Sequence, residues 1–387
     1  MFLREITLRN LLSFGPETPP FALRNLNVLI GPNGSGKSNF IEAIGLLRSA
    51  PRDLTAPIRE GGGINEWLWK GLPDQTATIA AVFEADEMTG GLRHAIGIQR
   101  AEDRLHALVT DLIGEAGAGL VDGTRWFASS KWGSAFVYDK DNTPRALPND
   151  PDAFDRSVLE RYNEPLGYPE LDTLSNYYKK VKLYQNWVFG KDSPLREPQT
   201  SDGRGDFLSE RLDNLGLVLK RLKRQPGVKN AILGSLEGLY PSITDFDVDI
   251  FGTRVIPYLE EGTYSIPAIR LSDGTLRYLC LLAILCHPDP PPLICIEEPE
   301  FGMHPDALLT ICKLIEEASE RTQLIITTHS TFLLDYFTHD PEAIVVCEKG
   351  EQGTTMTRLD QKELEIWLKE YSLGNLWTSG QIGGNRW

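Results

Sequence analysis

Residues 26–48 have the sequence LNVLIGPNGSGKSNFIEAIGLLR, and this stretch decides the fold class. It begins with Leu26–Ile30, a mostly apolar run that predicts a buried strand. A glycine-rich segment follows, and four apolar residues from Phe40 to Leu47 then recur at helical spacing. Strand, glycine loop and helix in this order are the setting in which a phosphate-binding loop works.

The glycine-rich segment fits the pattern G-x-x-x-x-G-K-[ST]. Glycines let backbone N–H groups close around phosphate oxygens, and the helix N-terminus adds the positive end of its dipole. Lys37 is expected to reach the β- and γ-phosphates of ATP, and the Ser38 hydroxyl to bind Mg²⁺. A chance glycine turn is the alternative, and the flanking strand and helix argue against it. The predicted nucleotide-binding residues are Gly31, Pro32, Asn33, Gly34, Ser35, Gly36, Lys37, Ser38 and Asn39.

A second apolar strand, Leu293–Ile296, ends in two acids, Glu297 and Glu298. A short apolar run predicts a core parallel strand, whose carboxyl end is where α/β sheets bind ligands. Adjacent carboxylates repel each other unless a cation lies between them. We expect Glu297 to hold Mg²⁺, usually through water, and Glu298 to accept the proton of the attacking water. A solvated strand end would have the same residues, but the glycine loop upstream favours the catalytic interpretation.

Two further motifs have both an ordinary and a functional interpretation. Ser272 in Leu271–Thr275 is a good helix N-cap, and with Gly274 it also presents a hydroxyl, an amide and a helix dipole to an anion. The motif's position about 20 residues before the carboxylate strand favours anion binding. His329 follows the apolar strand 324–328, where it is either a core histidine or a partner of the γ-phosphate. We favour the phosphate contact.

The ordered set GPNGSGKS, LSDGT, ICIEEPE and TTHS resembles the signature set of ABC-type ATPases. The variant is similar to the RecF/OLD/SMC-related AAA family ATPases and not to transporter domains, in the segments Ile6–Phe14, Glu298–Pro305 and Leu373–Gly380. The resemblance covers essentially the whole chain and implies that Lys37, Glu298 and His329 are catalytic.

The resemblance also implies an ATP-dependent homodimer, or a higher oligomer, in which the LSDGT turn of one copy closes over ATP held by another. In one departure, Glu297 stands where many relatives have Asp, and we expect its longer side chain still to reach the metal through water. Gln99, at a predicted strand end, is a candidate for the glutamine-loop residue.

The fold expected from these patterns is α/β: an ABC-ATPase-like mixed sheet with a P-loop, an antiparallel β subdomain and a helical insertion. Residues 1–138 would hold the P-loop and β subdomain, and 139–240 the helical insertion. Residues 241–345 would carry the signature, carboxylate and histidine motifs, and 346–387 a C-terminal extension. The insertion has no sustained heptad pattern, which excludes a long coiled-coil arm.

The net charge of −15 over 387 residues does not draw the chain to nucleic acid. Residues 177–230 are the exception, with twelve Lys and Arg against six Asp and Glu, and with interleaved aromatics. This region is either a DNA-facing surface or a solvated helix face with core aromatics. Asp247-Val-Asp249 is either a metal-binding D-x-D or part of an ordinary strand.

The five cysteines lack metal-ligand spacing and are expected in the core of a protein from a reducing compartment. The N-terminus lacks a signal-peptide core, and the longest apolar run, Tyr278–Cys286, is less than half of the ~20 residues that span a bilayer. We therefore expect a cytoplasmic protein with no membrane contact.

Three functions compete. The first is an ATPase switch that controls a separately encoded nuclease or other effector in DNA surveillance or antiphage defence. The second is a RecF-like repair mediator that binds DNA in an ATP-dependent way. The third, a transporter subunit, is disfavoured by the EEPE sequence and the helical insertion. About 45 residues follow the His329 strand and its helix, which is few for a nuclease domain, so we expect that the chain does not cut nucleic acid by itself.

Overall fold

The computed structural model describes residues 1–72, 75–84, 91–102, 106–116, 125–139, 141–148, 150, 152–162 and 167–383. The chain forms two compact units. Unit 1 comprises residues 1–181, 342–360 and 382–387, and unit 2 comprises 182–341 and 361–381. Each unit is built from segments distant in sequence, so both depend on long-range contacts.

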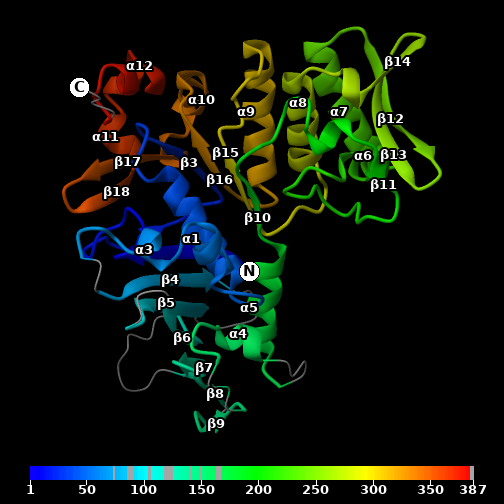
Figure 1. Ribbon diagram of the computed structural model, residues 1–387. Helices are drawn as coiled ribbons and strands as arrows, with labels where there is room; N and C mark the ends of the chain where they lie inside the picture. The colour runs from blue at the N-terminus through cyan, green and yellow to red at the C-terminus, as the bar shows by residue number, and fades with distance from the viewer. Residues whose placement is uncertain are drawn as a thin grey trace. The chain divides into compact units, whose positions relative to one another are not determined.

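Unit 1 contains an eight-stranded antiparallel sheet (Figure 1). Its strands from β4 onward pair in chain order, which confirms the antiparallel β subdomain predicted from the sequence. β5 alternates buried and half-buried residues along most of its length, as a strand with one face on the core does. In sheet order the strands are β2 (Phe21–Ala22), β1 (Phe2–Arg9), β4 (Ala77–Glu84), β5 (Leu92–Arg100), β6 (Ala107–Glu115), β7 (Trp126–Lys131), β8 (Ser134–Tyr138) and β9 (Pro144–Ala146).

A buried polar network joins this sheet to α5 (Pro169–Lys180). His94 of β5 lies 2.7 Å from the Tyr178 hydroxyl through Nδ1 and 2.7 Å from Asp111 Oδ1 through Nε2. The other oxygen of Asp111 accepts from Ser157 Oγ and from the backbone N–H of Val158. The imidazole, the carboxylate and the Ser157 side chain are buried and hydrogen-bonded, as buried polar groups must be to avoid a desolvation cost.

Unit 1 also holds three strands in the order β3 (Leu26–Ile30), β17 (Ile344–Gly350) and β18 (Gly353–Arg358), and all five residues of β3 are buried. β17 lies parallel to β3, and β18 lies antiparallel to β17. The helix α1 (Lys37–Ser49) begins after the glycine loop and buries the apolar residues predicted to form its core face. The other helices of this unit are α2 (Ala56–Glu60), α3 (Ile64–Trp67) and α4 (Val158–Arg161).

Unit 2 contains three parallel strands, β10 (Lys182–Tyr184), β15 (Leu293–Glu297) and β16 (Gln323–Thr328). All six residues of β16 and the first four of β15 are buried. Eleven of the thirteen residues of α8 (Asp273–Leu285) are buried, because its sequence is apolar on every side. The remaining helices are α6 (Leu215–Lys223), α7 (Pro226–Leu239), α9 (Pro305–Ser319), α10 (Thr331–Tyr336), α11 (Gln361–Leu364) and α12 (Leu373–Thr378).

A second sheet in unit 2 is antiparallel and lies beside α6 and α7 (Figure 1). Its strand order is β11 (Gln199–Thr200), β13 (Arg254–Glu261) and β12 (Ile243–Phe251), with β14 (Tyr264–Pro267) also paired to β13. The predicted α/β class, with a P-loop, an antiparallel subdomain and inserted helices, is confirmed. The four-segment division remains a prediction.

The cysteines occupy buried positions as free thiols, and all five lie among the described residues. Burial raises the pKa of Cys312 and Cys286 to about 12, so these thiols stay protonated at neutral pH. Among the described residues, no helix is long and apolar enough to cross a membrane.

Candidate nucleotide site

The predicted phosphate-binding loop connects β3 to α1 within unit 1. Gly34 and Gly36 have φ values of 77° and 101°, a region that favours glycine, so the loop's sharp path depends on these two residues. Lys37 is only 6% exposed, and its Nζ donates to the backbone oxygens of Gly31 at 2.7 Å and Pro32 at 3.2 Å. Ser38 is exposed on the first turn of α1, where a hydroxyl is accessible to a cation.

The rest of the loop is supported by the β17–β18 hairpin, which the sequence analysis did not connect with it. Thr354 Oγ1 lies 3.0 Å from the Ser35 carbonyl and 2.7 Å from Ser13 Oγ, and Thr354 is 2% exposed. A Cβ on Gly36 would overlap both hydroxyls, Thr354 Oγ1 and Ser13 Oγ. Gly36 is therefore required for two reasons, its backbone angle and the close approach of β18.

Unit 2 brings the predicted base and the predicted histidine together at the carboxyl ends of β15 and β16. Glu297 is in register with Thr327, and the Glu298 N–H donates to the Thr327 carbonyl at 3.0 Å. Glu298 Oε1 then lies 3.4 Å from His329 Nε2. Glu298 has φ of 43°, a left-handed backbone that is uncommon for a residue with a side chain.

Glu297 is the predicted metal ligand, and its side chain fits that role chemically. Its Oε1 is buried and has no hydrogen-bond partner among the described residues. A buried carboxylate oxygen without a hydrogen-bond partner is a suitable ligand for Mg²⁺, which prefers oxygen donors. The second predicted ligand, Ser38, belongs to unit 1.

Glu300 is part of this strand-end cluster, although the sequence analysis gave it no role. Its Oε1 accepts from Thr328 Oγ1 at 2.6 Å and from the His329 N–H at 3.0 Å. Burial raises the pKa of the Glu300 carboxyl, against these hydrogen bonds, which lower it. The EEPE sequence, with a third acid two residues past the pair, was the available signal.

The signature turn also lies in unit 2. Ser272 caps α8 and accepts from the Thr275 N–H at 3.1 Å, which confirms the ordinary interpretation as an N-cap. The anion-binding role of this turn remains a prediction. A Cβ on Gly274 would lie 2.9 Å from the Gly302 carbonyl, which places this glycine against the loop after the carboxylates. Ser272, Gly274 and Gly302 line one cavity of 480 Å³ together with Tyr240 and His304.

Gln185 is a further residue of this edge that sequence reasoning missed. It follows β10, which pairs in parallel with β15 so that Tyr184 is opposite Ile296. Gln185 therefore lies at the carboxyl end of the strand beside the Glu297–Glu298 strand. The earlier candidate, Gln99, belongs to the antiparallel sheet of unit 1, where its amide donates to Thr76. The two glutamines were hard to rank from sequence because β10 has only three residues.

The candidate DNA surface, residues 177–230, is divided between the two units at residue 181. Its aromatic residues Tyr177, Tyr178 and Tyr184 are buried, as the core-aromatic interpretation predicts. The cations Lys179 and Lys180 are exposed, whereas Lys223 lies 3.0 Å from Asp245.

One acid of the D-x-D motif, Asp247, pairs with a lysine of the same chain. Lys223 Nζ lies 2.5 Å from Asp247 Oδ2, and Lys229 Nζ lies 2.9 Å from Asp245 Oδ2. The first acid of the motif is thus neutralised by a lysine, which supports the interpretation as an ordinary strand.

A glycine loop between a strand and a helix, with acids and a histidine at the ends of parallel strands, defines the ABC-type class of ATPase. The family model described as "AAA domain, putative AbiEii toxin, Type IV TA system" matches residues 26–100 and 139–335. The chain belongs to this family of AAA-domain proteins. No curated protein matches it significantly.

Solved structures with the same fold include two SMC head domains. One is an SMC head bound to the C-winged helix domain of ScpA, with 12% identity and a TM-score of 0.51, covering 94% of this chain and 99% of that chain. The other is the Smc head with an extended coiled coil bound to the C-terminal domain of ScpA, from Pyrococcus furiosus. It has 13% identity and a TM-score of 0.51, and covers 95% of this chain and 99% of that chain.

Proposed function

We propose that this chain binds and hydrolyses ATP with Mg²⁺, and that two copies close over the nucleotides as a switch. The observation that carries the proposal is the 3.4 Å approach of Glu298 Oε1 to His329 Nε2 at the ends of adjacent parallel strands. A carboxylate there accepts the proton of the attacking water, while His329 donates to the γ-phosphate.

The Mg²⁺ ion would be held by Ser38 and Glu297, and it would neutralise charge on the phosphates during transfer. Lys37 would bind the β- and γ-phosphates. Gln185 would contact the metal or the attacking water from the strand beside Glu297. These roles are supported by residue type and by position at the strand ends.

Substitution of Glu298 by Gln tests the chemistry. The variant should bind ATP normally but not turn it over, because the water loses its base while Lys37 still binds the phosphates. It should also accumulate a closed dimer with ATP, visible by light scattering. Lys37→Ala should instead weaken ATP binding itself. Hydrolysis by Glu298→Gln at the wild-type rate would show that another residue is the base.

The closed dimer would place Ser272 and Gly274 of one copy against the ATP of the other. This part of the proposal is supported by the exposed anion-binding chemistry of a capped helix N-terminus beside the 480 Å³ cavity. Ser272→Arg should abolish hydrolysis while each copy still binds ATP. Unchanged hydrolysis in Ser272→Arg would remove the cross-copy arrangement.

The switch would control a separately encoded nuclease or other effector in DNA surveillance or antiphage defence. The family description names a putative toxin of a toxin–antitoxin system, and the matched SMC heads were solved with a bound partner domain, ScpA. Both support a chain that acts through a partner. Co-purification from the native host, with and without Glu298→Gln, would identify the effector by its dependence on the closed state.

A RecF-like repair mediator is the second candidate, and it would need ATP-dependent DNA binding. The exposed Lys179 and Lys180 favour it, while the pairing of Lys223 with acids counts against it. Purified protein should be assayed for binding and cutting of plasmid and single-stranded DNA with ATP and Mg²⁺ or Mn²⁺. We expect no cutting. Cleavage that persists through purification and is lost in a site variant of this chain would refute the separate effector.

A further inference from the structure

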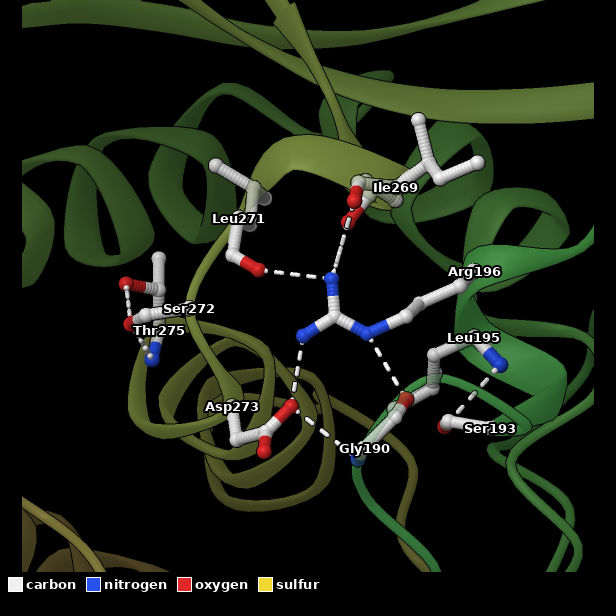
Figure 2. Close-up of polar contacts among 10 residues, drawn as sticks. Gly190, Ser193, Leu195, Arg196, Ile269, Leu271, Ser272, Asp273 and Thr275 are labelled. Carbon is white, nitrogen blue, oxygen red and sulfur yellow. Dashed lines mark hydrogen bonds and ion pairs between the residues drawn. The ribbon is translucent and has the colours of Figure 1, made fainter.

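One arginine outside the motifs contacts the residues on both sides of the signature serine, a backbone carbonyl before it and a side-chain carboxylate after it (Figure 2). Arg196 ends a short 3-10 turn, Pro194–Arg196, and its side chain is only 14% exposed. Its Nη1 donates to the carbonyls of Leu271 at 2.8 Å and Ile269 at 3.0 Å. Its Nη2 lies 2.5 Å from Asp273 Oδ1. Leu271 immediately precedes Ser272 and Asp273 immediately follows it, so a single guanidinium holds both neighbours of the serine.

Arg196 and Asp273 also hold Gly190, which lies in the same segment of the chain as Arg196. Arg196 Nε donates to the Gly190 carbonyl at 2.8 Å, and the Gly190 N–H donates to Asp273 Oδ1 at 3.0 Å. The hydrogen bond from Arg196 is the main reason that the pKa of Asp273 lies below its ordinary value. A planar guanidinium can satisfy this set of acceptors in a fixed geometry, whereas a lysine ammonium cannot.

The same segment contacts α8 again, one turn further along that helix. The Arg277 guanidinium lies over the rings of Trp187 at 5.2 Å and Phe189 at 4.8 Å. Arg277 Nη1 also donates to the carbonyl of Glu298 at 2.9 Å. Residues 185–196, which begin with Gln185 after β10, are therefore joined both to the signature turn and to the loop of the predicted base.

We propose that Arg196 is a positioning residue that orients the signature turn toward the nucleotide of a second copy. This inference rests on the proposed cross-copy site. Through Gly190 and Asp273, Arg196 links the segment that starts at Gln185 to the turn that carries Ser272. Loss of the guanidinium removes the donor to the Leu271 carbonyl and the partner of the Asp273 carboxylate, while the chain's own phosphate-binding loop, in unit 1, keeps its contacts.

The test compares Arg196→Ala and Arg196→Lys with Arg254→Ala, an exposed arginine of the same unit. Binding of a fluorescent ATP analogue should change by less than about twofold in all three, while hydrolysis should fall about tenfold or more in both Arg196 variants. Arg254→Ala should hydrolyse ATP like the wild type. Wild-type hydrolysis in Arg196→Ala would overturn the proposal.

Mixing distinguishes positioning across copies from a general loss of structure. In a mixture of Arg196→Ala with Lys37→Ala, half of the dimers would pair an intact loop with an intact signature turn, so activity should recover to about a quarter of wild type. The pair Ser272→Arg with Lys37→Ala is the reference and should recover equally. Recovery in the reference pair alone would refute the role of Arg196, and recovery in neither pair would refute the cross-copy site itself. If Arg196→Ala folds poorly, Asp273→Asn takes its place, because it keeps a polar side chain beside Arg196. It should show the binding, hydrolysis and recovery that are expected of Arg196→Ala.

Discussion

The left-handed backbone of Glu298 leads to a prediction that separates its structural cost from its chemistry. With φ of 43°, any residue that has a Cβ is strained at this position, and glycine is not. We compare Glu298→Ala with Glu298→Gly. Both variants lose the carboxylate and should lose hydrolysis, so any difference in stability between them reports the backbone alone.

The expected difference follows from two opposing terms. A left-handed conformation costs an L-residue about 1–2 kcal/mol relative to glycine. Glycine loses about 0.5–1 kcal/mol more conformational entropy on folding than alanine does. The Gly variant should therefore be the more stable by about 0.5–1 kcal/mol, which raises its melting temperature by about 1–4 °C in a unit of this size.

Thermal and urea unfolding of both variants measure this difference directly. Glu317 supplies the control, because it is exposed within α9, where the backbone is right-handed. There Glu317→Gly should be less stable than Glu317→Ala by about 1 kcal/mol, the reverse order. If Glu298→Ala proves as stable as Glu298→Gly or more stable, the inference that the backbone is strained at Glu298 is wrong.

Three further predictions concern other contacts. Glu300→Ala should lower the free energy of unfolding by about 1–3 kcal/mol, because a buried hydroxyl and a backbone N–H lose their acceptor, and urea unfolding measures this. Gly36→Ala should weaken ATP binding about tenfold or more, and by more than Gly34→Ala does. Both glycines have positive φ, but only Gly36 has atoms within 4 Å of the new Cβ. Titration with a fluorescent nucleotide compares the two variants. The Glu316 carboxylate raises the pKa of His339 above its ordinary 6.5. The pair should therefore stabilise the fold most between about pH 5 and 6 and lose this contribution as the pH rises through the raised pKa. His339→Gln should melt at a slightly lower temperature than the wild type at pH 5.5, and at the same temperature as the wild type at pH 9. The difference at pH 5.5 is small because both groups are about half exposed.

The local elements of the site were predictable because they depend on neighbours in the sequence. Glycine spacing, the buried run of β3 and the helical periodicity after Lys37 are all local properties, and each is present in the structure. The acids after β15 and the capping serine of α8 were predictable for the same reason. The roles assigned to these residues remain predictions.

The supporting contacts could not be predicted, because they join residues far apart in the chain. Thr354 reaches the Ser35 carbonyl across 319 positions, and Arg196 reaches the Leu271 carbonyl across 75. Gln185 could be located only when the parallel pairing of β10 with β15 was known.

The sequence by itself determined the class of protein, the phosphate-binding loop and the identity of the acids, because a motif is a local arrangement of residue types. Tertiary structure alone decided which side chains hold those motifs in place: Thr354 behind the loop, Glu300 under His329, and Arg196 beside Ser272. The physical reason is that a hydrogen bond to a backbone carbonyl needs only a donor at the right distance, and many residue types can supply one. No sequence pattern marks such a donor until the fold brings it there.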